Sequence, residues 1–435
     1  MGFFGRKRAP SVPHPRKEPR FDGPLTLKRL EQIFQDCVDF TKRPVSLGEG
    51  GACTLTLCYL SGMVKMERVS DYVLRPLAQD EALARCGTPR QAMDRMKDGA
   101  LYNLSAEERT RLDAAVFDLV NGCCLLLFPG ESSVLSLNVG TEEKRSISSP
   151  SNETVLKGSR DAFVESLRTN TSIVRRHLKA PELRIREQVV GRQSVTSVDI
   201  LYIEGLTNPH LVEQVAAQLA DIDIDAVLAT GNIEEYIVPA ARTAFPLVQY
   251  TERSDRFCAG LAEGRVGILI DGLPLGYLAP GVLGDFLQAP QDKSESWLLA
   301  SALTLLRYLC MLGTLLLPAL YVAMVTFHQE MIPTRLALSI IAAKQDVPFR
   351  SVFEVIVLLL AFEILQEAGL RLPQSIGQTV SIIGGLVVGS AAVEAKIISP
   401  AVLIVVAIAG IAGYTMPSQE VAGALRIWRF LLALL

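Results

Sequence analysis

Hydrophobic and polar positions are distributed unevenly along the chain. From Met1 to Trp297 charged, apolar and turn residues are mixed as in a water-soluble protein, whereas from Leu298 onward long apolar runs are separated only by short charged loops. About 20 apolar residues suffice for a helix to cross a bilayer core. The pattern therefore predicts an α/β N-terminal region of two small subdomains, followed by an all-α multi-spanning membrane bundle of about four to five helices.

The first predicted subdomain covers residues 21–145 and follows a basic, Pro-rich arm, residues 1–20, which we expect to be disordered. Helical spacing of apolar residues and short β-type runs alternate along it. We expect helices over Leu27 to Phe40, Asp71 to Cys86 and Ala106 to Leu112, and strands over Ala52 to Leu60, Cys123 to Phe128 and Val134 to Val139.

Polar residues rich in Ser, Pro and Gly predict a linker over residues 146–157, and the second α/β subdomain covers residues 158–290. A strand, a helix and a strand in succession indicate a βαβ-like crossover. We expect helices over Arg160 to Leu178, Pro209 to Leu219 and Ser254 to Leu261, and strands over Val198 to Ile203, Ala226 to Leu228, Arg265 to Asp271 and Leu273 to Leu278.

The membrane region covers residues 298–435 and begins with a long apolar run in which Arg307 is the only charge and Pro318 is an expected kink. Shorter apolar runs follow over Val352 to Leu365, Ile376 to Val393, Pro400 to Met416 and Val421 to Leu435. We expect the last of them to form a truncated helix. Residues 326–350 carry three basic side chains, which opposes an outside location. Their topology stays open, and Pro333 to Ala343 could be a half-helix that enters the bundle.

Ionisable residues within apolar helices indicate functional positions, because burying a charge in lipid is costly. Glu354 could pair with Arg350 one turn earlier, whereas Glu363 could face a partner helix or an aqueous path. Glu394 ends a Gly-rich segment. That segment holds Ser381, Gly384, Gly385 and Gly389, which either permit close helix packing or line a pore with Glu394 at its mouth.

Composition narrows the function. The net charge of −3 is close to neutral and does not indicate a nucleic acid as partner. The basic arm is either a solvated tail or is attracted to anionic lipid. No apolar signal segment follows the arm, and the eight cysteines lack C-x-x-C spacing, so we expect them reduced and structural. Phosphate-loop, nucleophile-elbow and zinc motifs are missing, and the four histidines are isolated in sequence. We predict no enzymatic activity, no metal and no cofactor.

Several runs resemble the A subunit of the GerA-type spore germination receptors. The most specific are LLPALYVA with TFHQEMIPT, within residues 315–334, and EAGLRLPQSIGQTVSIIGGLVVG, residues 367–389. Further matching runs lie at residues 163–183, 198–209, 222–228, 263–274 and 398–418. The F protein of the SpoVA operon has the same layout and is a second possibility.

This resemblance implies a protein of the spore inner membrane with a cytosolic N-terminal domain. Its partners would be a transporter-like B subunit, which binds the germinant, and a lipoprotein C subunit. The resemblance also implies contact with membrane lipid and self-association into a ring that conducts monovalent cations. A scaffold that organises the partners without conducting ions is the alternative, and Pro318 and Pro333 are the hinge candidates.

Overall fold

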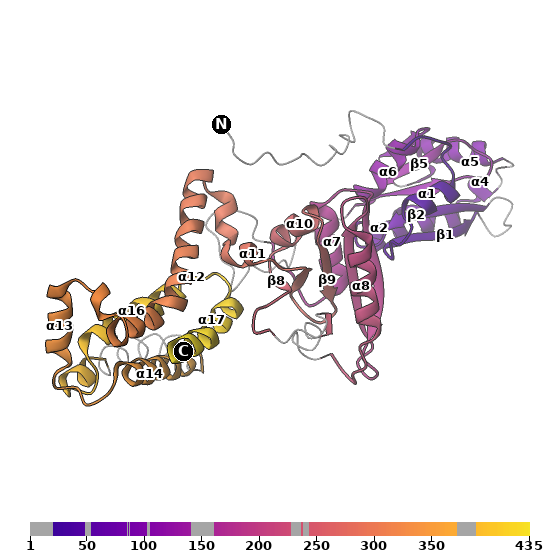
Figure 1. Cartoon of the computed structure of the whole chain (residues 1–435). Coiled ribbons are helices and arrows are strands. Elements are labelled where there is room, and N and C mark those ends of the chain that lie inside the picture. The colour runs from indigo at the N-terminus through magenta and orange to yellow at the C-terminus, as the bar shows by residue number, and fades with distance from the viewer. Residues whose placement is uncertain are drawn as a thin grey trace. The chain divides into compact units, whose positions relative to one another are not determined.

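The computed structural model describes residues 21–47, 54–84, 86, 88–101, 105–140, 161–227, 236–237, 243–371 and 389–435. Contacts divide the chain into two compact units (Figure 1). The α/β unit comprises Met1–Val155, Ser159–Pro239 and Tyr250–Pro280, and the helical unit comprises Leu156–Gly158, Ala240–Gln249 and Gly281–Leu435. Both sheets therefore belong to one compact unit.

The first sheet has the strand order β1-β2-β4-β5-β3 and is antiparallel throughout. Its apolar residues point to both faces, because helices cover each of them: α1 and α6 on one side and the segments from α2 to η2 on the other. The elements are α1 (Leu27–Ile33), β1 (Phe40–Ser46), β2 (Thr54–Leu60), α2 (Met66–Val69), η1 (Ser70–Leu74), α3 (Arg75–Gln79), α4 (Glu81–Ala84), α5 (Pro89–Arg95), η2 (Met96–Ala100), β3 (Ala106–Arg109), α6 (Leu112–Val120), β4 (Cys123–Leu127) and β5 (Val134–Asn138).

The strands predicted at β2, β4 and β5 are confirmed, but the helix predicted from Ala106 to Leu112 is wrong. Ala106–Arg109 forms the edge strand β3, which pairs with β5. Glu108 in this strand contacts Lys97 and Arg90, so the edge position accommodates its charge. Pairing with a strand distant in sequence overrides the local helix preference.

The second sheet has the strand order β6-β7-β9-β10-β8. Residues of α7 and α10 pack against one face, whereas α8 lies on the other, where Gln188 of β6 donates a hydrogen bond to the Ala216 carbonyl (Figure 1). The elements are α7 (Leu167–His177), β6 (Leu183–Val190), β7 (Thr196–Ile203), α8 (Pro209–Ala220), β8 (Gln249–Thr251), α10 (Ser254–Ala262), β9 (Val266–Ile270) and β10 (Gly276–Ala279).

Two features of this second subdomain differ from prediction. The crossover is not parallel, because the described pairings of β7, with β6 and with β9, are antiparallel. Helix α7 begins at Leu167 rather than Arg160. Within the described part of the preceding segment, Phe163 donates to the Glu252 carbonyl at 2.8 Å, and Ala162 forms a bridge with Arg253. These extended contacts hold the segment in a non-helical conformation.

Two glycines allow an aromatic pair to lie against the second sheet. Phe163 and Phe257 contact edge to face, with ring centroids 5.3 Å apart. A Cβ added at Gly267 would lie 2.3 Å from the Phe257 ring, and one at Gly276 would lie 2.6 Å from it. Both distances are far below van der Waals contact, so the close approach requires glycine at these positions.

The helical unit contains a packed group of helices. Helix α12 packs against α16 and α17, and α14 packs against the same two helices. The elements are α11 (Leu283–Leu287), η3 (Pro290–Ser294), α12 (Trp297–Thr326), η4 (Gln329–Met331), α13 (Thr334–Lys344), α14 (Ser351–Arg371), α16 (Pro400–Gly413) and α17 (Gln419–Leu434). The helix predicted over Ile376 to Val393 falls mostly outside the described residues.

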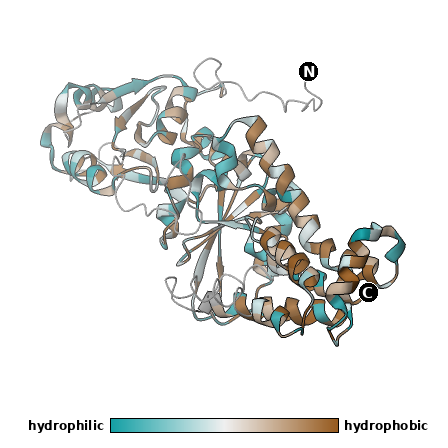
Figure 2. Ribbon diagram, turned by 90° about the vertical axis from the view of Figure 1, so that its left-hand side faces the viewer, coloured by the Kyte–Doolittle hydropathy of each residue, from teal (hydrophilic) through white to brown (hydrophobic). Residues whose placement is uncertain are grey.

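Hydrophobic residues dominate the helices of this unit near the marked C terminus, whereas hydrophilic positions recur through the helices of the α/β unit (Figure 2). Among the described residues, α12 is the one helix that is long and apolar enough to cross a membrane, and α16 is a shorter apolar helix. Pro318 is buried inside α12, and Pro333 precedes the first residue of α13.

Candidate functional site

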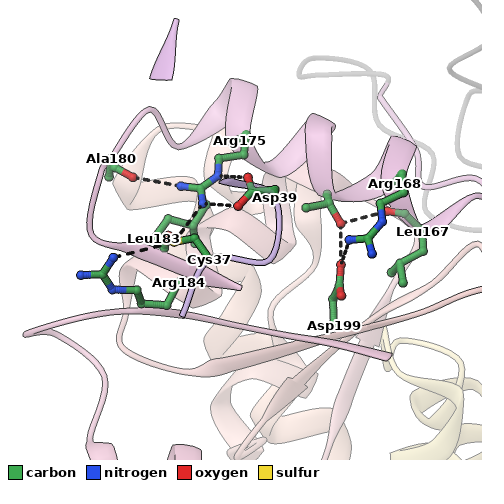
Figure 3. A network of polar contacts seen from close by, with 10 residues as sticks. Cys37, Asp39, Leu167, Arg168, Arg175, Ala180, Leu183, Arg184 and Asp199 are labelled. Carbon is green, nitrogen blue, oxygen red and sulfur yellow. Dashed lines mark hydrogen bonds and ion pairs between the residues drawn. The ribbon is translucent and has the colours of Figure 1, made fainter. Parts of the chain in front are cut away.

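Two regions of the chain hold buried charges, and the first joins the two sheets of the α/β unit. Arg175 of α7 lies against Asp39, with Nε 2.8 Å from Oδ2 and Nη2 3.0 Å from Oδ1. Both side chains are buried, at 1% and 2% exposure. Figure 3 shows the guanidinium and the carboxylate facing each other. A planar guanidinium suits this two-point contact with a carboxylate. The pair therefore fixes α7 against the segment that enters β1.

Backbone and thiol contacts extend this junction. Val38 donates to the Ile185 carbonyl at 3.0 Å, and Ile185 donates to the Asp36 carbonyl at 3.1 Å, so the segment lies along β6. The Cys37 thiol donates to the Leu183 carbonyl at 3.4 Å (Figure 3). The residues that end helix α1 early are thus held by the second subdomain, which explains why the helix predicted to reach Phe40 ends at Ile33.

Asp199 of β7 is a second buried carboxylate in the α/β unit. Its Oδ2 accepts a hydrogen bond from the Thr171 hydroxyl at 2.9 Å and lies 3.6 Å from the Arg168 guanidinium (Figure 3). Its Oδ1 is buried without a hydrogen-bond partner. Desolvation by burial raises the pKa of Asp199 to about 6, although Thr171 and Arg168 oppose the shift.

The sequence indicated that His177 is isolated, but in the structure it has polar neighbours. Its Nε2 lies 3.1 Å from the Ser254 hydroxyl and 3.6 Å from Asp161 Oδ2. In a catalytic triad the serine and the carboxylate face different ring nitrogens, whereas here one nitrogen faces both. Ser254 is also fully buried and donates to the Asp161 carbonyl at 3.1 Å. The contact joins the last residue of α7 to the first residue of α10.

The cysteines of the described ranges are free, with Cys53 outside those ranges. Burial raises the pKa of the Cys58 and Cys258 thiols to about 12 and that of Cys123 to about 11. Such thiols carry little thiolate at neutral pH, so these three side chains behave as small apolar groups.

The second region is in the helical unit, where Glu354 lies at the N-terminus of α16. The Ser399 amide donates to Glu354 Oε2 at 2.8 Å, and Lys344 Nζ lies 3.4 Å from Oε1. Glu354 is 1% exposed. The predicted pairing with Arg350 is therefore wrong, because the side chain reaches α16 and α13 rather than the preceding turn of its own helix. The positive end of the helix dipole at the N-terminus of α16 also stabilises this carboxylate.

Glu363 of α14 faces helix α17. Its Oε1 accepts from Arg429 at 2.6 Å, and its Oε2 lies 3.4 Å from Arg426. The prediction that Glu363 could face a partner helix is consistent with this contact within the chain. The two arginines were not predicted as site residues. Their spacing of three residues within an apolar run is the signal that would have placed them on one face of a helix.

Of the predicted site residues in the Gly-rich segment and at its end, the structure describes Gly389 and Glu394. Glu394 is exposed and is the last helical residue of the described stretch 389–394, and a Cβ at Gly389 would lie 3.3 Å from Leu403. Gly389 thus permits close approach to α16. Ser381, Gly384 and Gly385 fall outside the described residues.

Comparison with known proteins gives the family. The model for the Bacillus/Clostridium GerA spore germination protein matches residues 28–435. The chain therefore belongs to the GerA family of spore germination proteins, in agreement with the resemblance of its sequence runs.

Individual proteins are similar to this chain over much of its length. Spore germination protein KA of Bacillus subtilis (strain 168) is 37% identical over 393 residues, which cover 90% of this chain and 72% of the relative. The uncharacterized membrane protein YfkQ of the same organism is 36% identical over 93% of this chain and 77% of its own length. The crystal structure of the N-terminal domain of the A subunit of the Bacillus megaterium spore germinant receptor GerK3 is 27% identical, covers 61% of this chain and 99% of that chain, and has a TM-score of 0.48.

Proposed function

We propose that this chain is the A subunit of a germinant receptor in the spore inner membrane. The helical unit would lie in the membrane and the α/β unit in the cytosol. A transporter-like B subunit and a lipoprotein C subunit would be its partners, and germinant binding would open a path for monovalent cations through a ring of A subunits. Several relatives are named spore germination proteins, which supports a role of this chain in germination.

The observation that carries the membrane location is the inverted polarity of the helical unit. Large apolar side chains of α12 and α16 are exposed, including Leu305 at 62% and Ile411 at 67%, whereas Glu354 and Arg429 are buried at 1% and 4%. In water, exposing this much apolar surface while burying charge would be unfavourable on both counts. In a bilayer the same arrangement places apolar groups against lipid and charges among helices.

Two features support the proposal that the helical unit conducts cations and does not merely anchor the chain in the membrane. Glu394 is exposed five residues after the small residue Gly389, so a symmetric ring could present one carboxylate from each subunit at a narrow opening. Pro318 lies inside α12, where a missing backbone donor weakens the helix and favours bending during gating.

Cation release from spores tests this function. Spores that lack their own receptors would carry this chain with B and C subunits, and K⁺ release would be followed after addition of a mixture of amino acids and sugars. Glu394→Gln is expected to slow the release severalfold, because each subunit loses one charge at the opening. Glu330→Gln, at another exposed position of the same unit, is the control.

Unchanged K⁺ release in Glu394→Gln would remove this residue from the path. A non-conducting scaffold is the alternative, favoured by the junction around Arg175 that makes the two sheets one unit. Recording from the purified complex in a planar bilayer separates the two functions, since a scaffold gives no unitary currents.

A further inference from the structure

A cavity of about 330 Å³ lies within the helical unit, where residues of α12, α14, α16 and α17 surround it. Its lining includes Thr314, Gln366, Tyr414, Gln419, Arg426 and Arg429. Tyr414 and Gln419 are exposed, whereas Arg429 is 4% exposed. The lining therefore extends from the surface of the unit to a buried guanidinium.

The charges of the described residues that line this cavity, taken with their partner Glu363, do not balance. Arg429 and Arg426 both contact Glu363, at 2.6 Å and 3.4 Å, so two positive groups share one carboxylate. Among the described residues that line the cavity, the arginines are the charged ones. The group as a whole carries one net positive charge, and an unbalanced charge among apolar helices is costly unless an anion joins it.

Two buried polar atoms of the lining residues also have no hydrogen-bond partner. Arg429 Nε is an unused donor, and Gln366 Oε1 is an unused acceptor. The amide nitrogen of Gln366 donates to the Tyr414 hydroxyl at 2.9 Å, which leaves Oε1 of the same amide as the unused acceptor. Water could use both atoms but would not supply the missing negative charge. A ligand that satisfies all three requirements needs an anionic oxygen and a hydroxyl group.

We infer that this cavity binds a singly charged phosphate group that has a hydroxyl beside it. The anionic oxygens accept from Arg429 Nε and from the Arg426 guanidinium, and the hydroxyl donates to Gln366 Oε1. Inorganic phosphate in its monoanionic form has this chemistry, and so does the headgroup of phosphatidylglycerol. The inference does not depend on ion conduction, and it assigns a ligand to residues outside the proposed opening at Glu394.

Binding can be measured on the full chain purified in an uncharged detergent, as the shift of its thermal unfolding with ligand concentration. The probes are short-chain phosphatidylglycerol, short-chain phosphatidylcholine and inorganic phosphate at constant ionic strength. Phosphatidylcholine has a phosphate but lacks the net charge and the hydroxyl. We expect phosphatidylglycerol or inorganic phosphate to stabilise the chain and phosphatidylcholine to act at least tenfold more weakly. Phosphatidylglycerol alone would identify a lipid site, and inorganic phosphate would identify a site for the free ion.

Arg426→Gln is the decisive variant, because this side chain is partly exposed and its removal should leave the fold intact. We expect the half-saturating concentration to rise at least tenfold, with Arg426→Lys intermediate and the exposed Arg335→Gln unchanged. Equal stabilisation by phosphatidylcholine, no response to either anionic probe, or equal binding by Arg426→Gln would each overturn the assignment. Should Arg426→Gln unfold, Gln366→Leu tests the same site, since it removes the acceptor for the hydroxyl without changing charge.

Discussion

Arg175 and Asp39 form a buried two-point ion pair although they are 136 residues apart in sequence. One belongs to the helix that precedes the second sheet, and the other lies directly before β1 of the first sheet. Because neither charge reaches solvent, each depends on the other for its compensation. Breaking this pair is therefore expected to make the two subdomains separate from each other more easily.

Asp39→Ala should lower the opening free energy of the junction by about 3 to 5 kcal/mol, because it leaves the Arg175 guanidinium buried without its carboxylate. Hydrogen exchange of amides in α7 and β6 would measure the loss. Asp223→Ala is the matched control, since Asp223 pairs with Arg192 at the surface and both are about two-thirds exposed. Equal protection in the two variants would show that the buried pair does not hold the junction.

Asp199 should make the α/β unit less stable as pH rises. Its pKa of about 6 in the folded chain lies above the usual value of 3.8, so folding favours the protonated form. Stability is then lost as pH rises from about 4 to 6 and stays lower above that window. Asp199→Asn should be more stable than the parent at pH 7.5, by up to about 3 kcal/mol, with the difference vanishing near pH 4.

Urea-induced unfolding of the full chain at pH 4, 6 and 7.5, followed through amides of β7, would test this pH dependence. Asp221→Asn, at an exposed position, is the control and should change stability little. A parallel pH profile for Asp199→Asn and the parent would contradict the prediction.

Gly267→Ala should destabilise the second sheet by about 1 to 3 kcal/mol, because the new methyl group would overlap the Phe257 ring. The expected readout is a lower midpoint in urea for the strands β7, β9 and β10. Phe257→Leu combined with Gly267→Ala should recover part of the loss relative to the sum of the single changes, since the shorter side chain vacates the contested space. Strict additivity would argue against a clash.

Glu354→Ala should destabilise the helical unit by about 2 to 4 kcal/mol, since the Ser399 amide and Lys344 lose their buried partner. Fluorescence of Trp297 and Trp428, both in this unit, would follow thermal unfolding in detergent. Glu330→Ala removes an exposed carboxylate from the same unit and should leave the midpoint within about a degree of the parent. Glu354→Gln should fall between the two, because it keeps a hydrogen-bond acceptor.

The sequence by itself determined the elements whose signal is local. The β-type run at β2, the alternation in β5, the Pro at the first turn of α8 and the apolar length of α12 each predicted an element that the structure contains. It also determined the family, because the runs around residues 315–334 and 367–389 are long and specific. In each case neighbouring residues carry the information.

Tertiary structure decided the features that depend on distant partners. Ala106–Arg109 is a strand because β5 offers its edge, and α1 ends early because β6 binds the residues that follow it. Glu354 pairs with Lys344 and the start of α16 rather than with Arg350, and Glu363 meets two arginines more than sixty residues away. Burial makes such pairings strong, and burial is set only when helices and strands far apart in sequence pack together.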